Sequence, residues 1–142
     1  EDALMLLNHK DAIEFVVDEV PHYGIRDVVV RNIQSLLMNG LLRHSDALGK
    51  TRNTVVSITD SVYVPLQAPQ LLDEMLASIV DKCCQIKNPI EAAFFLWVNI
   101  AYLQPFEDGN KRTSRHNNAS LSNGMCAGTA SAPSTARYIC HK

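Results

Sequence analysis

The sequence predicts an all-α domain, a helical bundle that carries one small β-hairpin. Several stretches repeat apolar residues at helical spacing, one short stretch alternates instead, and proline or glycine separates them. With 142 residues the chain is long enough to bury one compact core. Its net charge of −2 argues against a nucleic-acid partner, because nucleic-acid-binding domains usually show a strongly basic face.

Two helices are expected in the first forty residues. The first carries apolar residues on one face and should end at Pro21, since proline disrupts a helix interior. The second should begin near Ile25 and stop at Gly40, because glycine readily takes the left-handed shape that ends many helices. The apolar positions are Ala12, Ile13, Val16, Val17 and Val20 in the first helix, and Val29, Ile33, Leu36 and Leu37 in the second.

Residues 51–65 change from a helical to an alternating period. Apolar residues alternate with others on both sides of a Thr-Asp-Ser turn, a pattern typical of a short β-hairpin. On a helical protein such a hairpin need have no function of its own. Its alternating residues are Val56, Ile58, Val62 and Val64.

Two more helices are expected after the predicted hairpin. A wide apolar stripe over residues 68–87 predicts the first of them. Asn88 as N-cap and Pro89 at N1 make a favourable start for the second. That helix is apolar almost all round, so we expect it to lie buried at the centre of the bundle, with Phe94 and Trp97 in the core.

Residues 104–115 should form a tight loop and the first turn of a last helix. Pro105 disfavours helical geometry in the residue before it, and Gly109 and Asn110 tolerate the positive φ of a tight loop. A helix N-terminus attracts anions, and the cationic side chains after it would strengthen this cradle. Asp108 adds a hard oxygen ligand, so the loop suits a polyphosphate with Mg²⁺. The cationic residues are Lys111, Arg112 and Arg115.

This loop resembles the signature motif of the Fic (Fido) family, which runs His-Pro-Phe-x-Asp/Glu-Gly-Asn-Gly/Lys-Arg-x-x-Arg. Here the motif reads Gln-Pro-Phe-Glu-Asp-Gly-Asn-Lys-Arg-Thr-Ser-Arg, with Gln104 in the place of the histidine. The segment Gly49-Lys50-Thr51-Arg52 also resembles the family's Gly-x-x-Arg lead-in. The resemblance implies a Fic-like bundle in which residues 51–65 form a flap that holds a target segment as an added strand.

The same resemblance implies transfer of AMP from Mg·ATP to a hydroxyl side chain of a target protein docked on the flap. Asp108 would bind Mg²⁺, while Gly109 and Asn110 would bring backbone and amide donors to the phosphates. Gln104 stands where the family has its catalytic base, and a carboxamide does not accept protons near pH 7. Loss of a general base typically costs roughly 10²–10⁴-fold in rate, so activity should be weak or lost. The implied nucleotide-binding residues are Gly109, Asn110, Lys111, Arg112 and Arg115.

Three alternatives remain open. The chain could be a catalytically silent Fic-fold module that binds nucleotide or peptide. It could be a Doc-like phosphotransferase, since Lys111 resembles that branch of the family, in which the γ-phosphoryl is transferred. Without the resemblance it would be a helical interaction domain, with a solvated basic helix start and Gln104 as a plain helix-ending residue.

We expect residues 1–115 to form the Fic-type domain and residues 116–142 to be an atypical tail, altered or partly disordered. The tail is rich in small and polar residues and has no acidic residue. The family's inhibitory motif, Ser/Thr-x-x-x-Glu-Gly/Asn, is absent from the sequence, so an inhibitory helix would come from a missing N-terminal segment or from another chain.

The sequence also predicts a cytoplasmic protein without a membrane partner. No signal peptide opens the chain, and no apolar run is long enough to span a bilayer. The four cysteines include no CxxC spacing, which favours reduced thiols over a disulfide framework.

Overall fold

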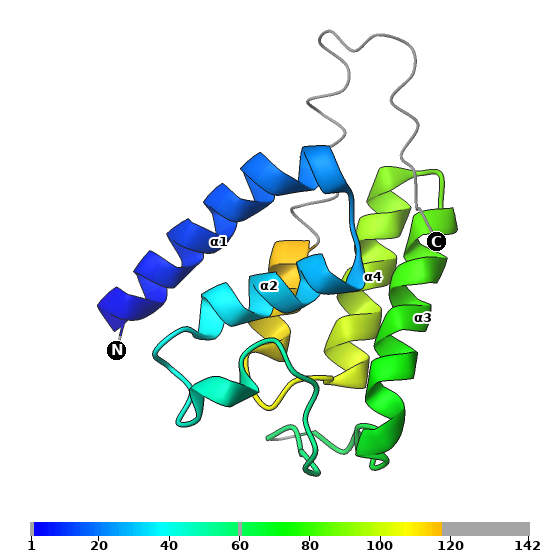
Figure 1. The fold of residues 1–142 in the computed structure, drawn as a ribbon. Coiled ribbons are helices and arrows are strands. Elements are labelled where there is room, and N and C mark those ends of the chain that lie inside the picture. The colour runs from blue at the N-terminus through cyan, green and yellow to red at the C-terminus, as the bar shows by residue number, and fades with distance from the viewer. Residues whose placement is uncertain (1, 60, 118–142) are drawn as a thin grey trace, which may run out of the picture.

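The computed structural model describes residues 2–59 and 61–117, which form a helical bundle (Figure 1). The prediction of an all-α fold is therefore confirmed. A helical segment at residues 110–117 comes after the loop that ends the fourth α-helix. The α-helices are α1 (Asp2–Tyr23), α2 (Asp27–Met38), α3 (Leu72–Gln85) and α4 (Pro89–Leu103), and the 3-10 helices are η1 (Ser45–Ala47) and η2 (Pro69–Leu71).

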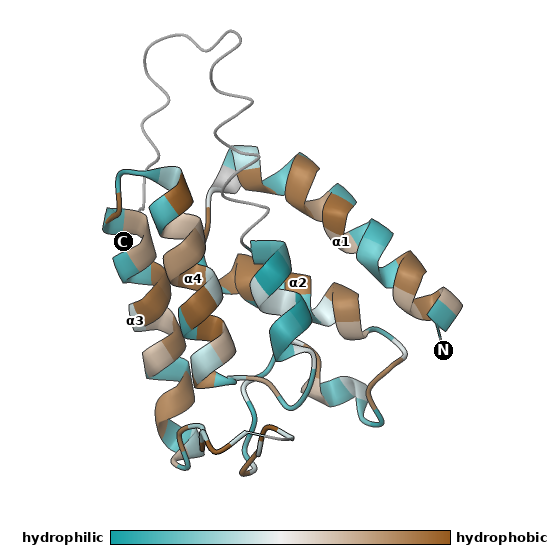
Figure 2. Cartoon of the chain, turned by 180° about the vertical axis from the view of Figure 1, so that it is seen from behind, coloured by the Kyte–Doolittle hydropathy of each residue, from teal (hydrophilic) through white to brown (hydrophobic). Residues whose placement is uncertain are grey.

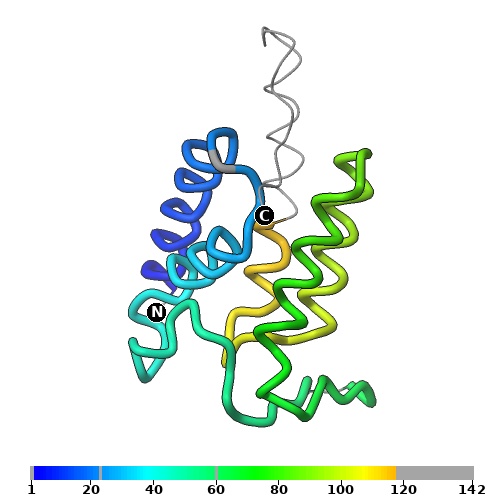
Figure 3. Tube along the Cα trace, turned by 45° about the vertical axis from the view of Figure 1, so that its right-hand side comes forward, coloured from blue at the N-terminus to red at the C-terminus, as the bar shows by residue number. Residues whose placement is uncertain are grey.

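The helices pack as two pairs, with α1 against α2 and α3 against α4. Helix 110–117 lies between the two pairs, as Figures 1 and 3 both show. His9 of α1 reaches this helix, since its Nδ1 lies 2.6 Å from Nε2 of His116. The core takes its largest fully buried apolar side chains from α2, α3, α4 and the loop after α4: Val30, Ile33, Leu37, Met38, Leu72, Leu76, Leu96, Ile100 and Phe106.

Helix α1 continues past Pro21, so the prediction that it ends there is wrong. Pro21 removes only its own N–H donor, and the N–H groups that follow it can still bond to carbonyls of the preceding turn. The helix ends instead at Gly24, which adopts φ +67° and donates its N–H to the carbonyl of Val20 at 2.8 Å. This left-handed glycine is a common helix terminator.

Helix α4 is buried on one side only, which corrects the prediction that it lies at the centre of the bundle. Phe94 is 60% exposed and Trp97 38% exposed, so neither is a core residue. Figure 2 shows how apolar the helix is along its length. An all-round apolar composition permits burial on every side, but a neighbour must also be present, and among the described residues α4 packs mainly against α3. The buried face consists of Ala92, Ala93, Leu96, Ile100 and Leu103.

The predicted β-hairpin does not form paired strands. The described part of residues 51–65, hereafter the flap segment, contains bends, a turn and backbone without regular structure, but no strand. One turn is closed by the N–H of Ser61, which donates to the carbonyl of Ile58 at 3.2 Å. The segment is held instead by bonds to Arg52 and to α4. Alternation of apolar residues was therefore not enough to predict strand pairing.

The remaining predictions concern the cysteines, the membrane and the tail. Cys83 is a free, buried thiol as expected, but Cys84 is disulfide-bonded, so the prediction of reduced thiols is wrong for that residue. None of the described helices is both long and apolar enough to cross a membrane. Helix 110–117 continues through His116 and Asn117, and the rest of the predicted tail lies outside the described residues.

Candidate active site

Helix α4 ends at Gln104, the residue in the place of the family's histidine. Gln104 adopts the left-handed conformation with φ 49° and ψ 57°, and it is the one described non-glycine residue with positive φ. This conformation costs a non-glycine residue roughly 1–2 kcal/mol, so surrounding contacts must hold it. Its N–H donates to the carbonyl of Ile100 at 3.0 Å, and its side-chain Nε2 donates to the carbonyl of Ala101 at 2.6 Å. The carboxamide is thus turned back onto the last turn of α4.

The loop after α4 is closed by Asn110 and Phe106. Asn110 donates from Nδ2 to the carbonyl of Phe106 at 2.8 Å and accepts from its N–H through Oδ1 at 2.9 Å. The ring of Phe106 is fully buried and anchors the loop in the core. Both polar atoms of the Asn110 side chain therefore hold the loop together. The amide donor that the resemblance assigned to the phosphates is already engaged.

Two buried side chains of α2, Gln34 and Met38, support the loop. Gln34, fully buried, donates from Nε2 to the carbonyl of Asp108 at 3.3 Å and accepts from the N–H of Gly49 at 2.6 Å. Gly109 adopts φ +78°, and a Cβ atom there would meet Sδ of Met38 at 2.6 Å. Sequence reasoning gave Gln34 and Met38 no role, because their helical spacing marks them only as residues on the buried face of α2.

A pocket of about 550 Å³ lies between this loop and the flap segment. It brings together most of the residues that the sequence singled out, although they come from segments about fifty residues apart. Arg115 is exposed on the next turn of helix 110–117 and does not line the pocket. The lining residues are Val56, Ser57, Ile58 and Thr59 from the flap segment and Gln104, Glu107, Asp108, Gly109, Asn110, Lys111 and Arg112 from the loop.

The loop side of the pocket combines cations, carboxylates and a helix N-terminus. Arg112 pairs with Asp108, with Nη2 3.8 Å from Oδ2, a long contact on a solvent-accessible side. Helix 110–117 begins here, because the N–H of Thr113 donates to the carbonyl of Gly109 at 2.8 Å. The first turn of a helix carries N–H groups that have no intrahelical partner, and residues 110–112 of this turn line the pocket. The helix N-terminus and the cations favour a bound anion, and the carboxylates beside them favour an anion that carries a bound metal cation.

Asp108 fits a magnesium ion only if the nucleotide supplies the other ligands. The described residues contain no group of three or more His, Cys, Asp or Glu side chains that could hold a metal. Mg²⁺ is commonly bound through one or two carboxylates, phosphates and water rather than by an all-protein cage. The carboxylate of Asp108 is 65% exposed and borders the pocket, while its Oδ1 accepts from the N–H of Gly109 at 2.5 Å and its Oδ2 lies 3.8 Å from Nη2 of Arg112. A magnesium ion would have to share these oxygens with those contacts.

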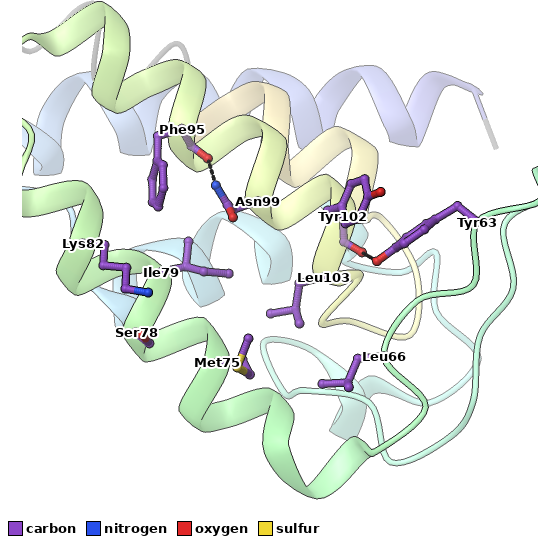
Figure 4. A pocket seen from close by; sticks show the side chains of 10 residues that line it. All are labelled: Tyr63, Leu66, Met75, Ser78, Ile79, Lys82, Phe95, Asn99, Tyr102 and Leu103. Carbon is purple, nitrogen blue, oxygen red and sulfur yellow. Dashed lines mark hydrogen bonds between the residues drawn. The ribbon is translucent and has the colours of Figure 1, made fainter.

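The flap segment rests against α4 through a tyrosine pair. Tyr63 donates from its hydroxyl to the carbonyl of Tyr102 at 3.0 Å, and the two ring centroids lie 4.0 Å apart (Figure 4). Burial, together with the neighbouring Tyr102, raises the pKa of Tyr63. This pair also lines a second hollow of about 320 Å³ between the flap segment, α3 and α4, with Lys82 and Asn99 on its walls.

Comparison with known proteins identifies the family. A family model described as Fic/DOC family matches residues 25–119, more than half of the chain. A protein adenylyltransferase Fic from Nematostella vectensis is 27% identical over 123 residues, which cover 78% of this chain and 27% of that protein. A crystal structure of a Fic domain containing signaling protein from Bacteroides thetaiotaomicron shares the fold, with a TM-score of 0.74 at 18% identity over 88% of this chain and 49% of that one. The chain thus spans between a quarter and half of these relatives, and it belongs to the Fic/DOC family.

Proposed function

We propose that this domain binds Mg·ATP in the pocket between the flap segment and the loop, and transfers AMP to a hydroxyl side chain of a target protein at a rate limited by Gln104. The observation that carries the proposal is the pocket itself. It joins a helix N-terminus, two cations and two exposed carboxylates to part of the flap segment on the opposite wall. A volume of about 550 Å³ lies within the range of small-molecule sites.

The charges on the loop suit a metal-bound triphosphate better than a bare anion. Lys111 and Arg112 are balanced by Glu107 and Asp108 among the lining residues, so a highly charged phosphate would meet no net positive excess. Mg²⁺, when bound at Asp108, would neutralise phosphate charge. Arg112, released from its long contact with Asp108, could then donate to phosphate oxygens. Arg115 does not line the pocket, so it would bind an anion outside the pocket.

Gln104 leaves the site without a proton acceptor at the family's position. Its carboxamide cannot take a proton from a hydroxyl near neutral pH, and its Nε2 is bound to Ala101. The other contributions, positioning and electrostatic stabilisation, depend on residues that are present. Nucleotide binding should therefore survive where turnover is impaired.

The flap segment has the features needed to receive a peptide strand. Around Val55 and Val56 the backbone forms no helix, turn or strand pairing among the described residues, and Val55 is exposed. An unpaired backbone segment can accept main-chain hydrogen bonds from an added strand. A target docked there would place its hydroxyl group over the same pocket that Gln104 borders.

Two observations favour alternative functions. The engaged side chain of Gln104 favours a catalytically silent module that binds nucleotide without turnover. Lys111, exposed and on the pocket wall, favours a Doc-like transfer of the γ-phosphoryl group, because its ammonium could hold the terminal phosphate of a reversed nucleotide.

Labelled ATP distinguishes these functions in the native chain and in a Gln104→His variant. Incorporation of the α-label into protein by Gln104→His, at roughly 10²–10⁴ times the native rate, would support AMP transfer limited only by the missing base. Incorporation of the γ-label alone would support phosphoryl transfer. Gln70→His, at an exposed position of η2, is the matched control and should leave incorporation unchanged. If Gln104→His binds Mg·ATP and incorporates neither label, transfer is refuted and the silent module stands.

A further inference from the structure

We propose that Arg52 is a positioning residue of this site. It holds the flap segment and the carbonyl of Gln104 in a fixed position relative to each other. The proposal rests on the proposed function, because the two walls that Arg52 joins are those of the nucleotide and target pocket. The family resemblance concerns only the spelling of residues 49–52. The positioning role follows from the bonds that Arg52 makes.

The guanidinium of Arg52 binds three carbonyl groups from three places in the chain. Nε donates to the carbonyl of Gln104, Nη1 to that of Thr54 and Nη2 to that of Leu66, each at 2.7 Å. The N–H of Arg52 also donates to the carbonyl of Pro105 at 2.8 Å. Thr54 lies near the start of the flap segment and Leu66 directly follows its end, so one side chain closes the base of the segment.

No carboxylate compensates this charge among the described ion pairs. Arg52 is only 3% exposed, and burial lowers its pKa. A buried cation that is held by carbonyls alone is unusual, because burying a charge without a partner is costly. The arrangement uses the planar fork of donors that arginine has and lysine lacks, since three diverging carbonyls must be met at once.

The bond to Gln104 acts on the residue at the catalytic position. Gln104 holds a left-handed backbone that most residues avoid, and the bond from Arg52 fixes the carbonyl of that residue. The phosphate-facing part of the loop is held separately, by Asn110 and Gln34. Loss of Arg52 should therefore disturb the flap and the catalytic position while leaving the nucleotide cradle in place.

The test compares Arg52→Lys with Arg43→Lys, an exposed control, in the native and the Gln104→His backgrounds. With α-labelled ATP as the probe and incorporation of the label into protein as the readout, Arg52→Lys should lower the labelling rate at saturating Mg·ATP by roughly tenfold or more, the equivalent of one lost charge-assisted hydrogen bond. The Kd for Mg·ATP, measured by calorimetry, should change by less than about threefold. A parallel loss of nucleotide affinity and labelling rate, or no change in either, would overturn the proposal.

A measurement on the native chain removes the dependence on folding of the variant and on catalysis. By NMR, the Nε–H of Arg52 should exchange slowly with water and show a scalar coupling across its hydrogen bond to the carbonyl carbon of Gln104. A rapidly exchanging Nε–H without this coupling would refute the positioning role even if Mg·ATP binds. A coupled Nε–H in a chain that binds no ATP would refute the proposed function and leave the bond network intact.

Discussion

Replacing Gly109 by alanine should destabilise the domain for two reasons that can be separated. The residue adopts φ +78°, and the left-handed region costs an alanine roughly 1–2 kcal/mol. The added Cβ would also lie 2.6 Å from Sδ and 2.7 Å from Cγ of Met38, a side chain that is almost fully buried. Overpacking of this kind costs roughly 1–3 kcal/mol, so the free energy of unfolding should fall by about 2–5 kcal/mol in total.

Gly24 provides the matched control. It adopts φ +67°, close to that of Gly109, but a Cβ atom there would meet nothing within 4 Å. Gly24→Ala should therefore lower the free energy of unfolding by the backbone cost alone, roughly 1–2 kcal/mol. The difference between the two variants isolates the contact with Met38.

Urea unfolding, monitored by circular dichroism, gives both values under one set of conditions. Combining Gly109→Ala with Met38→Ala should recover part of the loss, since the shortened side chain makes room for the Cβ atom, with a coupling energy of roughly 1–3 kcal/mol. The reasoning fails if the two glycine variants differ by less than about 0.5 kcal/mol, or if the combined changes are additive within that margin.

Three further predictions address the helix start, a thiol and a histidine. Asn88→Ala should lower the free energy of unfolding by about 1 kcal/mol in urea titrations, because the N–H groups of Ile90 and Glu91 lose the side-chain oxygen that accepts from them at 2.9 and 3.3 Å. A loss of under about 0.3 kcal/mol would show that the cap does not stabilise the helix. Burial raises the pKa of the Cys83 thiol to about 11, so an alkylating reagent near pH 8 should leave this thiol unmodified until urea unfolds the chain. Mass spectrometry measures the modification, and rapid modification in the folded state would contradict the prediction. Burial and the neighbouring His9 lower the pKa of His116 below its ordinary 6.5, so the unfolded chain binds the proton more tightly. The stability that His116 contributes should be complete above pH 6.5 and should decline as the pH falls below that value. In urea titrations at decreasing pH, a His116→Gln variant should therefore lose free energy of unfolding less steeply than the native chain. An equal pH dependence of the two chains would contradict the lowered pKa of His116.

The helices were predictable because their signals are local. Asn88 and Pro89 mark the start of α4 through the chemistry of a cap, and the structure places the cap where that chemistry requires. Pro21 misled because a proline removes only its own N–H donor, and the helix continues for two more residues until Gly24 turns the backbone. The uncovered side of α4 could not be predicted, since apolar residues such as Phe94 do not reveal which neighbour, if any, covers them.

The residues of the loop could be singled out from the sequence, whereas the contacts that support the loop could not. The loop from Gln104 to Arg112 was recognisable from its sequence motif, and in the structure it lines one pocket. The contacts that support it are long in sequence, such as Gln34 to Asp108 and Arg52 to Gln104. No periodic pattern marks such pairs, so only the fold could show that the side chain of Asn110 closes the loop.

The central claim is that the pocket between the flap segment and the loop binds Mg·ATP, and calorimetric titration tests it most directly. The native chain should release or absorb heat with one-to-one stoichiometry when titrated with ATP and Mg²⁺. Omitting Mg²⁺ and replacing Asp108 by asparagine should each weaken this binding, and doing both should weaken it little further. Absence of heat with the native chain, or an affinity that neither change alters, would contradict the account.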